Sequence, residues 1–119
     1  MWGIGEDAMD EATGMVAIYT TFSTESDARK IGGELVEEKL AACVNIFPGM
    51  LSIYRWQGAV EEGTEAAMLV KTRKDLAEQV LAALAARHPY SVPALIVFEP
   101  RQVAASYLEW LCSETAAQP

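Results

Sequence analysis

Residues 42–72 carry the feature that most constrains the fold, a long run of strand-forming residues with only two interruptions. Residues 42–47 and 50–57 are rich in β-branched and aromatic side chains, which favours strands. Pro48-Gly49 predicts a bulge within one strand, and Gln57-Gly58 predicts a turn between two strands. The run therefore predicts an unusually long β-hairpin.

The outer part of this hairpin carries apolar side chains that one small domain has no means to cover. Ile53, Tyr54 and Trp56 favour a strand, whereas the middle of the returning strand, residues 59–72, is polar. An exposed apolar strand pair invites association with another chain. We therefore expect the hairpin to project as an arm and to be buried against a neighbouring subunit.

The segment before the hairpin predicts a strand followed by a helix. Residues 15–22 are apolar on both faces, which indicates a central strand. Ser23 or Thr24 can then cap an amphipathic helix that should end near Ala41.

The segment after the hairpin predicts a second helix, a fourth strand and a short C-terminal helix. Thr72 with Asp75 is a variant of the capping box. The second helix should end at His88, because a residue before proline avoids the helical conformation. Residues 92–100 predict a strand, and residues 103–111 predict an amphipathic helix.

The resulting order, βαββαβ with an added helix, predicts an α+β fold of the ferredoxin-like type, with an antiparallel sheet and two helices on one face. The crossover rule places the first strand beside the third. A chain of 119 residues suits one domain, for which we expect bounds of 15–113. Residues 1–14 should form a flexible acidic tail, and residues 114–119 a C-terminal tail.

Composition excludes several classes of function. A formal net charge of −8 argues against binding to nucleic acid. No apolar run approaches the roughly 18 residues of a membrane helix, and residues 1–14 do not resemble a signal peptide. Cys43 and Cys112 favour buried, reduced thiols in a cytoplasmic protein. No nucleophile, base or phosphate-binding loop is recognisable, so we predict no enzyme.

His88, the only histidine, has two readings from spacing alone. A histidine at a helix C-terminus commonly has a structural role, because its cation interacts favourably with the last carbonyl groups. As a metal ligand it would need partners. The acids Glu61, Glu62 and Glu65 have a similar choice between a solvated hairpin tip and a weak cation site.

Four stretches resemble the CutA family of divalent-cation tolerance proteins: KLAACVNIFPGMLSIYRWQG (39–58), MLVKTR (68–73), HPYSVPALIVF (88–98) and YLEWL (107–111). The resemblance implies a ferredoxin-like protomer in a homotrimer, and a role in tolerance of, or response to, copper and other divalent metal ions. Proposed copper ligands in that family are a cysteine late in the first strand and two adjacent histidines. Thr20, Arg87 and His88 stand at those positions here, so only His88 of this set is retained. It is expected to contact a metal ion weakly, alone or together with Cys43 or a carboxylate from a neighbouring chain.

The resemblance also leaves a second functional class open. Trimers of the nitrogen-regulatory PII class share the protomer plan and bind small ligands between subunits. On this alternative, an intersubunit cleft is lined by residues whose simplest role is packing: Trp56, Lys71, Tyr90, Tyr107 and Trp110.

Overall fold

The computed structural model describes residues 9–10 and 14–115. Its elements are β1 (Met9–Asp10), β2 (Met15–Phe22), α1 (Glu25–Glu37), β3 (Cys43–Trp56), β4 (Ala59–Arg73), the 3-10 turn η2 (Lys74–Leu76), α2 (Ala77–Arg87), β5 (Ile96–Phe98), β6 (Val103–Ala104) and α3 (Ala105–Ser113). Most of the two predicted tails, 1–14 and 114–119, lies outside the described residues.

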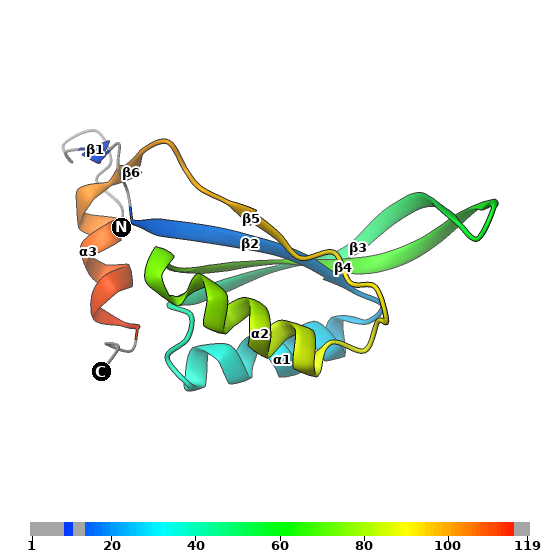
Figure 1. Cartoon of the computed structure of the whole chain (residues 1–119), viewed down its shortest axis with the longest axis horizontal. Helices are drawn as coiled ribbons and strands as arrows, with labels where there is room; N and C mark the ends of the chain where they lie inside the picture. Colours follow the sequence, from blue (N-terminus) through cyan, green and yellow to red (C-terminus); the bar gives the residue numbers. More distant parts are fainter. Residues whose placement is uncertain (1–8, 11–13, 116–119) are drawn as a thin grey trace.

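The main sheet is antiparallel and has the strand order β3-β4-β2-β5. The first long strand, β2, lies beside the third, β4, in a register that runs from Met15 opposite Arg73 to Phe22 opposite Ala66. The predicted α+β class, the place of β2 beside β4 and its central position are confirmed. Helices α1 and α2 cover one face of this sheet, and α3 lies at the end far from the hairpin tip (Figure 1). A second, two-residue ladder joins β1 to β6.

The core lies between this sheet and the helices α1 and α2. It contains Val16, Ile18, Phe22, Met68 and Val70 from the sheet, Ala28, Ile31 and Leu35 from α1, and Val80 and Leu84 from α2. Gly32 lets α1 approach the sheet closely. A Cβ atom at this position would lie 2.8 Å from Met68 Sδ and 2.9 Å from Val44 Cγ2.

Helix α1 begins with the predicted cap but ends earlier than predicted. Of the two candidate caps, Thr24 is the one used, because its Oγ1 accepts from the Asp27 backbone N–H at 3.0 Å. The predicted end near Ala41 is wrong. Lys39 has a φ of 61°, a left-handed conformation that stops a right-handed helix, and α1 ends at Glu37.

The predicted hairpin, bulge and turn are confirmed. The pairing between β3 and β4 shifts register between Phe47 and Met50, where Pro48-Gly49 lies. Gln57 and Gly58 form the turn with φ values of 49° and 83°. The outer hairpin, which we call the arm (residues 50–63), projects beyond the domain (Figure 1). The Cα radius of gyration is accordingly 15.5 Å, against about 13.5 Å expected for a compact chain of this length.

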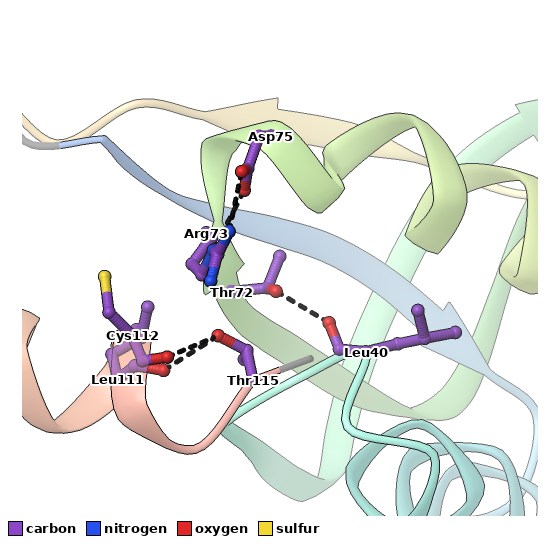
Figure 2. A network of polar contacts seen from close by, with 7 residues as sticks. All are labelled: Leu40, Thr72, Arg73, Asp75, Leu111, Cys112 and Thr115. Carbon is purple, nitrogen blue, oxygen red and sulfur yellow. Dashed lines mark hydrogen bonds and ion pairs between the residues drawn. The ribbon is translucent and has the colours of Figure 1, made fainter. Parts of the chain in front are cut away.

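The predicted capping box at Thr72 is wrong. Thr72 is still paired with Val16 in the sheet, and its buried hydroxyl donates to the Leu40 carbonyl oxygen at 2.6 Å (Figure 2). The following turn begins after Arg73, whose guanidinium forms an ion pair with Asp75 at 2.7 Å. The hydroxyl therefore ties the end of β4 to the loop after α1.

The C-terminal elements follow the prediction with different bounds. Helix α2 ends at Arg87, and His88 has an extended ψ of 133°, as the following proline predicts. The strand predicted over residues 92–100 is shortened to Ile96–Phe98, since this edge strand pairs with only three residues of β2. Within the described ranges, no helix is long and apolar enough to cross a membrane.

Candidate functional site

His88 lies where α2 meets the end of β2, packed between two aromatic rings. Its ring stacks on Phe22 with centroids 4.5 Å apart and an interplanar angle of 11°. The Tyr90 ring lies 4.9 Å away at 53°. We call Thr20, Thr21, Phe22, Glu65, His88 and Tyr90 the His88 cluster, because contacts or hydrogen bonds connect them all.

Hydrogen bonds engage both ring nitrogens of His88. The Tyr90 backbone N–H donates to Nδ1 at 3.1 Å, so Nδ1 is the acceptor and the proton of the neutral ring sits on Nε2. Nε2 lies 3.0 Å from Thr20 Oγ1, which accepts this proton. Burial lowers the pKa of His88, and a hydrogen bond to the Thr21 backbone and the charges of Asp27 and Glu65 only partly oppose this. His88 is therefore neutral at pH 7.

Glu65 belongs to the His88 cluster, although the sequence suggested a place at the acidic tip. Its Oε2 accepts from Thr21 Oγ1 at 3.0 Å and from the Tyr90 hydroxyl at 2.7 Å. Burial raises the pKa of Glu65, but hydrogen bonds from Tyr90, Ser52 and Thr21 outweigh it and hold the pKa below its ordinary value. The predicted grouping of Glu65 with the two tip acids is therefore wrong.

Tyr90 responds to the same environment in the opposite sense. Burial, followed by the hydrogen bond to Glu65 and the charge of that carboxylate, raises the pKa of Tyr90 far above its ordinary value. The tyrosine therefore stays protonated and acts as a hydrogen-bond donor to Glu65. Nothing in the local sequence around Tyr90 indicates this partner, which lies 25 residues away.

The Arg87 side chain pairs with acidic residues at the C-terminal end of α1. Its guanidinium forms a bidentate pair with Glu38, with distances of 2.8 and 2.9 Å, and a further bond with Glu34 at 3.1 Å. The hydrogen bond from Arg87 lowers the pKa of Glu38. The two adjacent residues that end α2 thus point to different partners, Arg87 to α1 and His88 to β2.

The donor atoms around His88 fit a tightly bound copper ion poorly. The structure brings Thr20 and His88 together, but Thr20 offers a neutral hydroxyl where a thiolate would select a soft metal ion. Both imidazole nitrogens already make hydrogen bonds. Across residues 9–10 and 14–115, no group of three or more His, Cys, Asp or Glu side chains is placed to hold a metal ion.

The five residues predicted to line a cleft fall in three separate places of one chain. Trp56 is exposed at the end of the arm, and Tyr90 belongs to the His88 cluster. Lys71, Tyr107 and Trp110 gather where α3 lies against β4. Lys71 Nζ is 5.7 Å from the Tyr107 ring centroid, and the Tyr107 and Trp110 rings are 5.6 Å apart.

The two cysteines are less buried than predicted. Cys43 is half-buried at the start of β3, with its thiol 4.0 Å from Asn45 Oδ1. Cys112 is exposed on α3, and the prediction that it is a buried apolar residue is wrong, because the apolar contact of this helix is made by the neighbouring, fully buried Leu111.

The fold defines an α+β domain with a projecting two-stranded arm, and comparison with known proteins gives its family. Residues 16–114 match the family model described as CutA1 divalent ion tolerance protein. The chain belongs to this family, as the sequence motifs predicted.

Relatives of similar sequence occur in bacteria and plants. The divalent-cation tolerance protein CutA of Thermus thermophilus is 44% identical over 98 residues, which cover 82% of this chain and 95% of the relative. The chloroplastic CutA of Arabidopsis thaliana is 38% identical over 100 residues, 84% of this chain. The chain spans 55% of that plant protein's length.

Solved structures agree with the sequence comparison. CutA from Synechococcus elongatus PCC7942 superposes with a TM-score of 0.87 at 36% identity, covering 92% of this chain and 96% of that chain. CutA1 from Ehrlichia chaffeensis gives a TM-score of 0.85 at 35% identity, covering 88% and 98%.

Proposed function

We propose that this chain acts as a homotrimer of ferredoxin-like protomers in tolerance of, or response to, divalent metal ions such as copper, and that His88 contacts the ion weakly. Membership of the divalent ion tolerance family supports the physiological role. The strand order β3-β4-β2-β5 with two helices on one face supports the protomer plan. The cytoplasmic location stays a prediction, since relatives include a protein named chloroplastic and one described as periplasmic.

One observation carries the assembly: apolar side chains are exposed along the whole arm and on the edge strand β5. Leu51, Ile53 and Val60 are each more than 60% exposed in the single chain, at 63%, 64% and 62%. Ile96, Val97 and Phe98 add a second exposed apolar stretch on β5. Contiguous surfaces of this kind mark protein–protein contacts, and unpaired strand edges supply backbone donors and acceptors for them.

Replacing Ile53 by aspartate tests the homotrimer. A charge at this position would be buried without a partner in the assembly, which is strongly unfavourable. We expect light scattering to find the wild type trimeric and Ile53→Asp monomeric, with the helical far-UV circular dichroism signal of the domain retained. Glu61→Gln, an exposed change on the facing strand, is the matched control and should stay trimeric. A folded wild-type monomer would contradict the homotrimer.

The weakness of the metal contact follows from the His88 hydrogen bonds. A metal ion at Nε2 would displace the proton given to Thr20 and force a proton onto Nδ1, where it would face the Tyr90 N–H. The neutral ring and the net charge of −8 act in the other direction, because they favour a cation nearby. We therefore expect weak binding with little preference for soft copper.

Calorimetric titration tests this contact on tag-free protein with copper(II) and with zinc. The wild type should give a weak isotherm, and His88→Ala should lose the heat of that site. Glu61→Gln serves again as the control, since it removes an acid of the arm but leaves the cluster intact. Identical isotherms for wild type and His88→Ala would remove His88 as a ligand.

A second candidate function is supported by the gathering of Lys71, Tyr107 and Trp110 beside α3. A cation close to the Tyr107 ring, which itself contacts the Trp110 ring, suits a planar or anionic small ligand bound between subunits, as in signalling trimers. A thermal-shift screen of nucleotides, organic anions and metal ions separates the two candidates. A shift with an organic ligand that Lys71→Ala abolishes would favour the signalling function, whereas shifts with metal ions alone would favour the first proposal.

A further inference from the structure

The arm leaves the domain at a place where the β-ladder is interrupted. The register of β3 on β4 shifts between Phe47 and Met50, and such bulges bend and twist a strand pair. The first residue pair beyond the shift is Met50 with Glu65. Glu65 therefore lies at the junction between domain and arm, where a small change of angle would move the tip farthest.

Groups from several segments hold the Glu65 carboxylate at this junction. Thr21, close to the end of β2, and Tyr90, in the loop after α2, donate to the same oxygen, Oε2, at 3.0 and 2.7 Å. Ser52 on the facing strand β3 also hydrogen-bonds to the carboxylate. One side chain thus joins β4 to β2, to β3 and to the loop.

The loop after α2 contacts the end of β2 on both faces of the sheet. Side chains alternate along a strand, so Thr20 and Phe22 belong to the face covered by α1 and α2, and Thr21 belongs to the other. His88 contacts Thr20 and Phe22, whereas Tyr90 shares the Glu65 oxygen with Thr21. The hydrogen bond from the Tyr90 N–H to His88 Nδ1 links the contacts on one face of the sheet to those on the other.

The Glu65 carboxylate is suited to a rigid joint because it is ionised at neutral pH. Its pKa lies below the ordinary value, and hydrogen bonds to an ionised acceptor are shorter and stronger than those between neutral groups. The acids of the arm itself, Glu61 and Glu62, are exposed and lie nearer the tip, opposite Tyr54 and Ile53.

We propose that Glu65 is a positioning residue for assembly: through contacts within its own chain, its carboxylate fixes the direction of the arm and so sets how tightly subunits associate. The inference rests on the proposed homotrimer. It assigns to the His88 cluster a mechanical role, in which Tyr90 and His88 anchor the joint to the helical domain.

Sedimentation equilibrium over a concentration series tests the joint. Glu65→Ala should raise the dissociation constant of the trimer by about tenfold or more, the effect of losing charged hydrogen bonds at one site. Tyr90→Phe and Thr21→Val, which each delete one hydroxyl, should raise it less. Glu61→Ala is the matched control and should change it by less than about twofold, as expected for an exposed side chain.

Hydrogen exchange supplies a readout that general destabilisation would not give. In Glu65→Ala, amides of residues 50–63 should exchange faster than in the wild type at concentrations where both are trimeric, and amides of β2 should not. Dissociation constants and arm exchange equal to those of Glu61→Ala would overturn the joint while leaving the homotrimer intact. A monomeric wild type would instead overturn the homotrimer itself, and this inference with it.

If Glu65→Ala does not fold, the two hydroxyl deletions decide. Tyr90→Phe and Thr21→Val keep the carboxylate and the shape of the side chains. Weaker assembly in both, with the circular dichroism of the wild type, would support the joint. Wild-type assembly in both would overturn it.

Discussion

The inner and outer halves of the β3–β4 hairpin share one backbone ladder but have opposite surroundings. In the inner half, Met68 and Val70 are fully buried against the helices. In the outer half, Ile53 and Val60 are more than half exposed, at 64% and 62%. Strand pairing therefore resumes beyond the register shift between Phe47 and Met50, where packing within the chain has ended. Backbone pairing alone therefore does not show which half is stable by itself, and under the proposed assembly the arm needs a partner that the domain does not.

Substitutions in the core and on the arm should differ most clearly in the quantity that they change, the free energy of unfolding or the dissociation constant. Leu35 is fully buried in the core, so Leu35→Ala should lower the free energy of unfolding by about 2–5 kcal/mol. Val60→Ala on the arm should instead raise the dissociation constant of the assembly and leave the domain's core intact. Urea unfolding followed by far-UV circular dichroism, beside sedimentation, distinguishes the two. Equal losses of unfolding free energy in both variants would contradict the difference in packing between core and arm.

Two adjacent glycines of α1 test how closely this helix packs against the inner half of the hairpin. Gly32→Ala would push a methyl group against Met68 and Val44, and should cost about 1–3 kcal/mol of unfolding free energy. Gly33 has open space at its Cβ position, so Gly33→Ala should stabilise the helix by about 0.5–1 kcal/mol. Thermal unfolding of both variants measures the difference, and a stabilised Gly32→Ala would contradict the close approach of α1 to the sheet.

Two threonines of β4 make the same comparison for polar groups. Thr72→Val should cost about 1–2 kcal/mol of unfolding free energy, because the Leu40 carbonyl loses a buried donor. Thr64 is exposed at the base of the arm, and Thr64→Val should leave the unfolding free energy within about 0.5 kcal/mol of the wild type. Urea unfolding again provides the measurement, and similar effects at both positions would argue against the Thr72–Leu40 tie.

The smallest effect concerns pH. Because the pKa of His88 is lowered in the folded chain, the unfolded chain binds a proton first as the pH falls. The stability from the neutral imidazole is complete above the ordinary histidine pKa of about 6.5 and is lost as the pH falls through the folded value. His88→Gln should lack this component. Unfolding free energies measured from pH 7.5 downward, for both proteins, should converge as the pH falls, and parallel profiles would contradict the assignment.

Local signals were sufficient to predict much of the fold. The pattern of residues 15–22 indicated a central strand, Pro48-Gly49 indicated the bulge, and Pro89 indicated the end of α2, which lies at Arg87, one residue before the predicted His88. These features depend on the conformational preferences of a few neighbouring residues. The predicted extension of α1 to Ala41 was wrong. The left-handed residue after the helix is Lys39, and neither glycine nor asparagine stands there to signal a helix end.

The His88 cluster could be predicted only in part, because its contacts are long-range. The family resemblance placed Thr20 and His88 in related positions, and they do lie together. Glu65 accepts a hydrogen bond from Thr21, 44 residues away in the sequence, and Thr72 donates one to Leu40, 32 residues away. Hydrophobic periodicity does not encode such side-chain partners. The sequence therefore favoured a local acidic tip and a local capping box where tertiary bonds prevailed.

We expect the domain to be stable by itself and the arm to depend on neighbouring chains. Hydrogen exchange of the wild type and of Ile53→Asp tests this most directly, with amides of β2 compared with those of residues 50–63. We expect equal protection of β2 in both proteins, and protection of the arm only in the assembled wild type. An arm that stays fully protected in a monomeric Ile53→Asp variant would show that it needs no neighbouring chain.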